Sequence, residues 1–116
     1  MQMDLSSMDS IRAFSIELGS RPDIQIDVLV ANAGAFNMGG ARSETKDGFE
    51  THLGTNCLGH FLLALLLIPN MLKSDSKPRI VFVGSKLYEL GHINWDDLQL
   101  QRSKWTCKDM TLRSPF

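Results

Sequence analysis

The stretch "IDVLVANAG", residues 26–34, decides the fold of this chain. It is a short apolar run rich in Ile and Val, and it ends on Asn32 and Gly34. A continuous apolar run of this kind is typical of a strand buried on both faces, as in a parallel sheet. A second run of the same character, "RIVFVGS" at residues 79–85, ends on a glycine and Ser85. The two runs predict two parallel strands of one sheet.

A helix is expected before the first strand, over about residues 8–18. Ser6 or Ser7 can cap it, and Gly19 ends the run. The apolar positions recur at helical spacing. They are Met8, Ile11, Phe14 (or Ala13) and Leu18.

A longer helix is expected between the strands, running roughly from residue 46 to 73. Thr45 can cap it, and Asp47 would lie in its first turn, where the helix dipole favours a negative charge. One stripe of its side chains should face the core. That stripe is Phe49, Leu53, Cys57, His60, Ala64, Leu67 and Met71.

The order of elements is helix, strand, long helix, strand, which is typical of a βαβ unit with parallel strands and a right-handed crossover. Residues 93–101, "INWDDLQLQ", predict a short turn or helix. The segment that follows has no period. We therefore expect a partial domain over residues 1–101 and a poorly ordered, divergent tail over residues 102–116.

Composition excludes several classes of partner. With 116 residues the chain holds at most one domain, and a net charge of −1 gives no electrostatic case for nucleic acid or an anionic membrane. The longest apolar run, residues 61–72, is too short to span a bilayer and contains Pro69. The chain is therefore expected to be soluble as written, with no membrane segment. Its compartment is left unknown, and an anchor on a longer parent is left open.

The cysteines and histidines indicate neither a disulfide framework nor a metal site. Cys57 lies in an apolar helical stretch and is expected to be a buried thiol, and Cys107 lies in the tail. His52 and His60 are eight positions apart, with no carboxylate or cysteine placed to complete a metal site. No metal is expected.

Chemistry is expected at the carboxyl ends of the strands, where open parallel sheets bind their ligands. Both strands end there in small or polar residues, and Gly34 tolerates backbone dihedrals that other residues cannot adopt. The alternative is that Asn-Ala-Gly is merely a turn. Asn56 and Gly59 are both poor helix-interior residues, which suggests a local kink with a polar group. The alternative is a half-exposed Asn56 with no role.

Four segments together resemble the short-chain dehydrogenase/reductases, in their retinol-dehydrogenase-like branch. They are "DLSSMDSIRAF", "IDVLVANAG", "TKDGFETHLGTNCLGHFLL" and "RIVFVGS". The resemblance covers about residues 3–100. It implies an α/β fold, here a partial Rossmann-type doubly wound parallel sheet. It also implies hydride transfer between NAD or NADP and a small-molecule alcohol or carbonyl, either retinol-like or another lipophilic substrate.

The resemblance also implies a set of cofactor-binding residues. Asp4 and Leu5 would line the adenine pocket, with the Asp4 carboxylate on the exocyclic amine. Asn32, Ala33 and Gly34 match the family's Asn-Ala-Gly motif, which stabilises the sheet and borders the ribose.

Two further residues match the catalytic machinery of the family. Asn56 matches the helix asparagine that holds a water in the proton relay through a helix kink. Ser85 matches the substrate-orienting serine, with Gly84 where the family usually has a first serine. Tyr88 is the chain's only tyrosine, but it lies too close to Ser85 and His92 stands where a lysine is needed. Tyr88 is therefore expected to be a loop aromatic.

Two family motifs do not occur in this sequence: the glycine-rich TGxxxGxG turn, which binds the pyrophosphate, and Tyr-x-x-x-Lys. We therefore expect a fragment of an oxidoreductase that is inactive alone. An alternative is a non-catalytic truncated protein that associates with a full-length relative, as a homo- or hetero-oligomer through the long helix. A third is a chain that does not fold.

Overall fold

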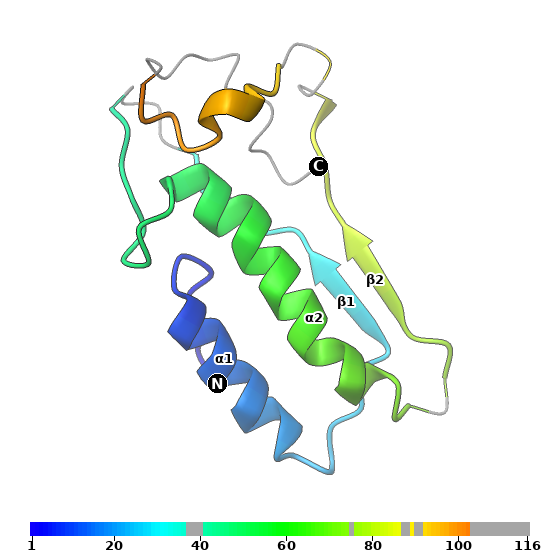
Figure 1. The fold of residues 1–116 in the computed structure, drawn as a ribbon. Helices are drawn as coiled ribbons and strands as arrows, with labels where there is room; N and C mark the ends of the chain where they lie inside the picture. Colours follow the sequence, from blue (N-terminus) through cyan, green and yellow to red (C-terminus); the bar gives the residue numbers. More distant parts are fainter. Residues whose placement is uncertain (37–40, 75, 87–88, 90–91, 103–116) are drawn as a thin grey trace.

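The computed structural model describes residues 1–36, 41–74, 76–86, 89 and 92–102. The expected order of helix, strand, long helix and strand is confirmed, with a short helical turn afterwards (Figure 1). The elements are α1 (Met8–Gly19), β1 (Val28–Ala31), η1 (Leu53–Gly59), α2 (His60–Met71), β2 (Arg79–Phe82) and η3 (Trp95–Asp97). The tail from residue 103 onward, Cys107 included, lies outside the described residues, so the boundary at residue 101 stays a prediction.

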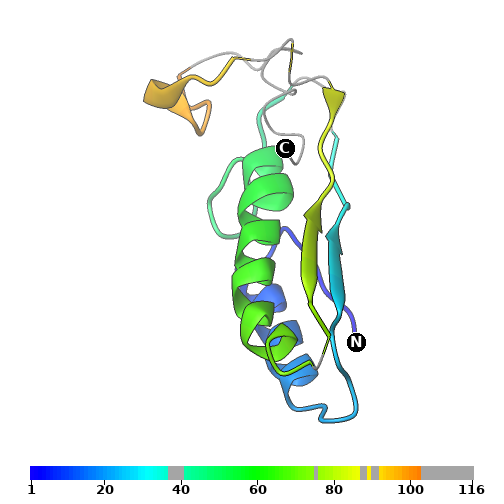
Figure 2. The same cartoon turned by 90° about the vertical axis from the view of Figure 1, so that its right-hand side faces the viewer.

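The two strands form a parallel sheet. Val28 pairs with Arg79 at one end and Ala31 pairs with Phe82 at the other. The backbone N–H of Val83 donates to the Ala31 carbonyl at 3.0 Å and continues the ladder past the strand ends. The long helix crosses from one strand to the other in the right-handed sense (Figures 1 and 2). This is the predicted βαβ unit of a partial Rossmann-type fold.

Both helices lie on the same face of the sheet, as Figure 2 shows edge-on. Leu29 and Ile80 of the strands pack on this side against a buried cluster. The cluster is Ile11, Leu18, Leu63, Leu67 and Met71.

The opposite face of the sheet carries exposed apolar side chains. Val28, Val30 and Val81 are 47%, 56% and 44% exposed. The prediction that the strands are buried on both faces is therefore wrong for the described part of the chain, because its helices form one layer and cover one face.

Helix α1 begins where the sequence indicated. Ser7 is its N-cap, and the Ser7 hydroxyl accepts from the backbone N–H of Ser10 at 3.0 Å. A second acceptor comes from far along the chain, since Asp47 Oδ2 accepts from the Met8 N–H at 2.8 Å. Asp47 was expected in the first turn of the long helix. That expectation is wrong, because its carboxylate serves the N-terminus of α1 instead.

The long helix begins at Thr51, several residues later than predicted. Its cap is Glu50, whose carboxylate accepts from the backbone N–H groups of His52 at 3.1 Å and Leu53 at 2.9 Å. Thr45 was the predicted cap, but it forms a turn before the helix, where its hydroxyl accepts from Phe49 N–H at 3.3 Å. Glu50 is almost fully buried, and its longer side chain satisfies two of the free N–H groups of the first turn.

The long helix is π-helical over Leu53–Gly59, soon after its start at Thr51, and it is α-helical again from His60 onward. Bonds from residue i to i+5 widen the turn, so a stripe drawn at 3.6-residue spacing drifts off the buried face. The predicted stripe is confirmed at His60, Ala64, Leu67 and Met71, which are buried. It is wrong for the remaining members. Phe49 precedes the helix, and Leu53 and Cys57 are only half-buried.

The helix spanning Leu53–Met71 is also longer than the apolar run on which the prediction of no membrane segment depended. With 19 residues and a mean hydropathy of 1.4, it could cross a membrane by length and composition alone. The fold buries 39% of that window, and the core helix of a soluble protein meets the same criterion. The helix is therefore weak evidence for a membrane span.

Candidate functional site

The carboxyl ends of β1 and β2 lie at the same end of the molecule as the start of the long helix (Figure 1). Asn32 follows β1 directly, and Ser85 follows β2 by three positions. Because the strands are parallel and in register, both segments leave the sheet at one edge. Ser85 is half-buried there and Lys86 is exposed. Tyr88 lies outside the described residues.

Asn56 joins the long helix to the segment that follows β1. Its amide oxygen accepts from the Ala35 N–H at 2.7 Å, and its amide nitrogen donates to the Ala35 carbonyl at 3.0 Å. The side chain is buried, with 3% of its residue surface exposed. The alternative that Asn56 is half-exposed is therefore wrong, and its role in a site stays a prediction.

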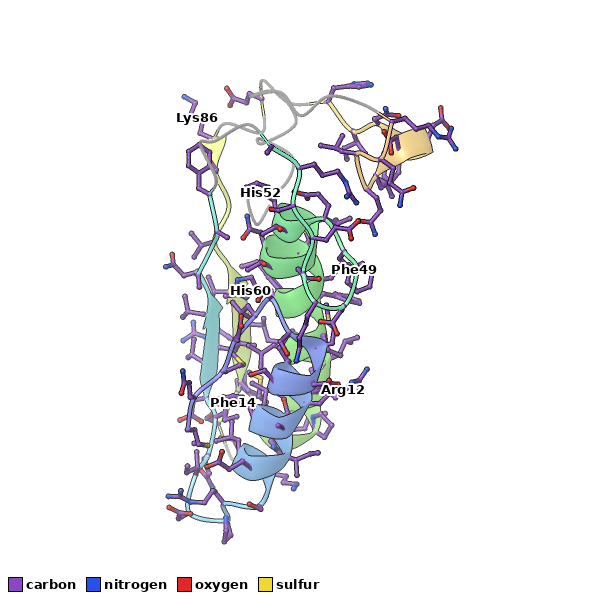
Figure 3. The ribbon with its side chains drawn as sticks, turned by 90° about the vertical axis from the view of Figure 1, so that its left-hand side faces the viewer. Arg12, Phe14, Phe49, His52, His60 and Lys86 are labelled. Carbon is purple, nitrogen blue, oxygen red and sulfur yellow. The ribbon has the colours of Figure 1, made fainter. Side chains whose placement is uncertain are left out.

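His60, one turn further along the helix, makes a second contact with the same segment. Its Nε2 lies 2.6 Å from the Ala33 carbonyl oxygen, and the ring is on the side of the helix that faces the strands (Figure 3). Residues four apart share one helix face, so Asn56 and His60 act side by side. We call this pair of side chains on the Ala33–Ala35 backbone the helix clasp.

His60 was not predicted as a site residue, because it falls in the apolar stripe expected to face the core. A histidine four positions after the unusual Asn56 was the available signal. Its position in the expected apolar stripe, between Cys57 and Ala64, favoured a core role. The contact with Ala33 could not be derived locally, since the two residues are 27 positions apart.

Gly59 explains the second unfavourable residue in this helix. A Cβ at Gly59 would lie 2.4 Å from the backbone oxygen of Leu5, which is closer than real Cβ atoms approach. The glycine therefore allows the segment before α1 to lie directly on the helix. The helix thus contacts the N-terminal segment through Gly59 and the segment after β1 through the helix clasp.

Asp4 lies in the turn that precedes α1 and is exposed. Its Oδ1 accepts from the Ser6 hydroxyl at 2.7 Å and from the Ser6 backbone N–H at 2.8 Å. These bonds stabilise the carboxylate and lower the pKa of Asp4 below its ordinary value. The side chain is therefore an anionic acceptor at neutral pH, next to the half-buried Leu5.

Asn32, Ala33 and Gly34 are all exposed at the strand edge. Among the described glycines, a positive φ occurs at Gly48 and not at Gly34. The expectation that Gly34 supplies unusual dihedrals is therefore not met. The absence of a side chain leaves its backbone open to a ligand instead.

The residues present fit the nucleoside parts of a nicotinamide dinucleotide better than they fit its pyrophosphate. Exposed backbone groups of Asn32–Gly34, the Ser85 hydroxyl and the Asp4 carboxylate are suitable partners for ribose hydroxyls and amino groups. No TGxxxGxG turn occurs in the sequence, so the glycine-rich binding site for the pyrophosphate is not present in it. In the described ranges no three His, Cys, Asp or Glu residues are grouped to hold a metal ion.

Comparisons with known proteins agree with this architecture. A family model described as short chain dehydrogenase matches residues 1–96. Retinol dehydrogenase 14 of Mus musculus is 47% identical over 102 residues, which are 88% of this chain and 29% of that protein. Polyprenol dehydrogenase of Mus musculus is 42% identical over 101 residues, again 29% of its length. The chain thus spans less than a third of these curated relatives.

A solved structure gives the same result in three dimensions. The crystal structure of an uncharacterised protein from Mycobacterium Paratuberculosis superposes with a TM-score of 0.75 at 33% sequence identity. The match covers 97% of this chain and 39% of that protein.

Proposed function

Because this chain belongs to the short chain dehydrogenase family, in the retinol-dehydrogenase-like branch, we propose that it forms part of the site of an NAD- or NADP-dependent oxidoreductase. The substrate would be a lipophilic alcohol or carbonyl, since similar proteins are named for retinol and polyprenol. The observation that carries the proposal is the helix clasp, which holds the segment after β1 at the edge where Ser85 also lies.

The cofactor would be held through its nucleoside parts. Asp4 and Leu5 would border the adenine, with the Asp4 carboxylate accepting from the exocyclic amine. Asn32, Ala33 and Gly34 would border a ribose. The nicotinamide ring, when bound, supplies the acceptor or donor of a hydride. These assignments draw on the family resemblance and on the exposure of the segment after β1.

The polar groups near the reacting end would be Asn56 and Ser85. Ser85 would hold the substrate oxygen through its hydroxyl. Asn56 would order a water for proton transfer from within the π-helical segment, whose wide turn alters the usual backbone bonding of a helix. Its side chain is occupied by Ala35, so this role would fall to its backbone.

The activity of the matching residues can be tested in a chimera. Residues 1–101 would replace the matching segment of mouse retinol dehydrogenase 14, and oxidation of retinol would be followed by cofactor absorbance. We expect activity that falls by about 100-fold or more in Ser85→Ala, by analogy with the loss of one positioned donor. A chimera that folds and binds cofactor but turns over no substrate would refute the proposal.

We also propose that the chain alone is catalytically silent, because its sequence contains neither the glycine-rich turn nor Tyr-x-x-x-Lys. The purified chain would be assayed for NADH and NADPH turnover with retinal. No rate above background is expected. Turnover that disappears in Ser85→Ala would overturn this part of the proposal and leave the oxidoreductase assignment intact.

A second function, association with a full-length relative, is favoured by the open surface of the sheet. Val28, Val30 and Val81 are exposed on one face, and in the described chain no strand pairs with the other edge of β1. That edge borders an apolar cavity of about 310 Å³, whose lining includes Met3, Phe14 and Val30. Unpaired edges of this kind pair readily with another chain.

Size-exclusion chromatography with light scattering separates the two functions. If association is the function, the chain should elute with a full-length relative, and the double variant Val30→Thr with Val81→Thr should elute alone. A chain that remains monomeric in the presence of the relative would exclude this function. A circular dichroism spectrum without a cooperative melt would instead favour the third alternative, an unfolded chain.

A further inference from the structure

His60 is a buried histidine that the family resemblance does not assign. Its residue surface is 3% exposed, and its Nε2 lies 2.6 Å from the Ala33 carbonyl oxygen. A carbonyl oxygen only accepts, so Nε2 must carry the hydrogen of this bond. The other ring nitrogen, Nδ1, is buried without a hydrogen-bond partner in the described part of the chain. Among the described residues the ring thus has one polar contact, with the segment after β1.

The helix clasp fixes three consecutive peptide groups. His60 holds the Ala33 carbonyl, and Asn56 holds both the N–H and the carbonyl of Ala35. These atoms belong to the peptides 33–34, 34–35 and 35–36. No peptide among the described residues is cis, and in a planar trans peptide the carbonyl and the N–H point in opposite directions.

Gly34 is the residue between the two anchors. The Ala33 carbonyl points toward the helix, so the Gly34 N–H on the same peptide points away from it. The Ala35 N–H also points toward the helix, so the Gly34 carbonyl points away as well. Gly34 is exposed, which agrees with this orientation. The helix clasp therefore turns the N–H and the carbonyl of Gly34 away from the long helix, at the carboxyl end of β1, where a ligand could bond to both.

We propose that His60 is a positioning residue, which sets the plane of the Ala33–Gly34 peptide through its Nε2–H and thereby aims the Gly34 N–H at the ligand. This deepens the proposed function, on which its ligand rests. A nucleoside ribose, with neighbouring hydroxyl donors and acceptors, suits such a donor and acceptor pair. The two bonds from Asn56 hold groups of Ala35, whereas the bond from His60 holds the carbonyl of the peptide between residues 33 and 34.

The first test uses the isotope-labelled chain itself and needs no activity. Imidazole nitrogen shifts should show that His60 is the Nε2–H tautomer, with a coupling across the hydrogen bond to the Ala33 carbonyl carbon. His60→Leu removes the donor and should move the amide nitrogen and the amide proton resonances of Gly34, because the plane of the Ala33–Gly34 peptide is no longer held. His60→Gln places an amide nitrogen near the position of Nε2 and should restore both. His92→Leu removes an exposed histidine and should change neither.

An Nδ1–H tautomer, or a Gly34 amide that is unmoved in folded His60→Leu, would overturn the proposal. If His60→Leu does not fold, the tautomer of the natural chain and the Gly34 amide of His60→Gln decide the question.

The second test uses the chimera with mouse retinol dehydrogenase 14. His60→Leu should raise KM for the cofactor about three- to tenfold with little change in kcat, because a ground-state contact is lost. His60→Gln should return KM toward its original value. An unchanged cofactor KM in active His60→Leu would refute the positioning role. An inactive parent chimera would refute the proposed function, while the spectroscopic result would still decide whether His60 orients Gly34.

Discussion

Asn56 and Ala35 exchange two hydrogen bonds, from Ala35 N–H to the amide oxygen at 2.7 Å and from the amide nitrogen to the Ala35 carbonyl at 3.0 Å. The asparagine amide thus bonds to both the N–H and the carbonyl of one residue, as a residue on a neighbouring strand would. It therefore gives the backbone after β1 a partner at the point where pairing with β2 ends. These two bonds tie the long helix to the segment that follows β1.

Removing the two bonds between Asn56 and Ala35 should lower the stability of the chain. We expect Asn56→Ala to lower the free energy of unfolding by about 2 kcal/mol, since two half-buried backbone groups of Ala35 lose their partner. Asn56→Asp should be at least as harmful, because a carboxylate cannot donate to the Ala35 carbonyl. Urea unfolding followed by circular dichroism measures both. Asn70→Ala, on the same helix, is the control, since Asn70 makes a long 3.4 Å bond to Lys73. Equal losses of stability in Asn56→Ala and Asn70→Ala would contradict the claim that the bonds from Asn56 to Ala35 stabilise the fold.

Gly59→Ala should destabilise the chain although alanine is the better helix former. The added Cβ would meet the Leu5 backbone oxygen at 2.4 Å, and relief requires the N-terminal segment to move. Overpacking of this kind costs about 1 to 3 kcal/mol. The matched variant is Gly19→Ala, where the nearest atom is the side-chain amide of Asn70 at 3.2 Å, which can shift. A higher melting temperature for Gly59→Ala would show that Leu5 does not lie against the helix.

Glu50→Gln should weaken the start of the long helix. Glu50 Oε1 accepts from the His52 backbone N–H and lies 2.8 Å from the His52 ring Nδ1, and Oε2 accepts from the Leu53 N–H, so an amide in its place loses one acceptor. The loss of a cap costs about 0.5 to 2 kcal/mol. Glu44→Gln is the control, because that carboxylate is 47% exposed in a surface pair with Arg42, a type of pair that contributes little. Hydrogen exchange of the His52 amide or of the Leu53 amide should quicken in Glu50→Gln, and both should stay unchanged in Glu44→Gln.

Asp27 provides a pH-dependent contribution at the other end of the sheet. The Ser74 hydroxyl, and then that of Ser76, donate to its Oδ1 and lower the pKa of the Asp27 carboxyl below its ordinary value. A lowered folded-state pKa means that this stabilisation is present above the unfolded value of about 3.9 and is lost as pH falls through the folded value.

A carbon-detected NMR titration should find the pKa of Asp27 below the ordinary range and closer to it in Ser74→Ala with Ser76→Ala. Ser20→Ala is the control, since the Ser20 hydroxyl donates to a backbone carbonyl of α1 and not to a carboxylate. A pKa for Asp27 that is the same in the natural chain and the double variant would refute the role of the two hydroxyls.

Much of the fold could be predicted because it depends on local patterns. The runs at residues 26–34 and 79–85 are rich in Ile and Val and end on small residues, so their strand character and direction could be inferred. Ser6 or Ser7 was expected as a cap because both precede an apolar period, and the structure has Ser7 in that place. The start of the long helix was misplaced because Thr45 is also a good cap by residue type. A buried Glu50 was needed to reveal the true boundary.

The candidate site was predicted in part, and for a similar reason. The sequence identified Asn56 and Gly59 as unusual inside a helix, but it did not indicate what they contact. The π-helical segment shifted the buried face away from Leu53 and Cys57, and no 3.6-residue stripe can anticipate a local change of pitch.

The sequence by itself determined the order of the elements, the parallel pairing and the membership of a family, because hydrophobic period and motif are properties of neighbouring residues. Only the tertiary structure decided which distant groups meet. Asp47 caps a helix that starts 39 positions earlier, and His60 holds a carbonyl 27 positions away. Such contacts depend on how the helices lie against the sheet. The residues next to a polar side chain in the sequence do not indicate which distant group it will bond to.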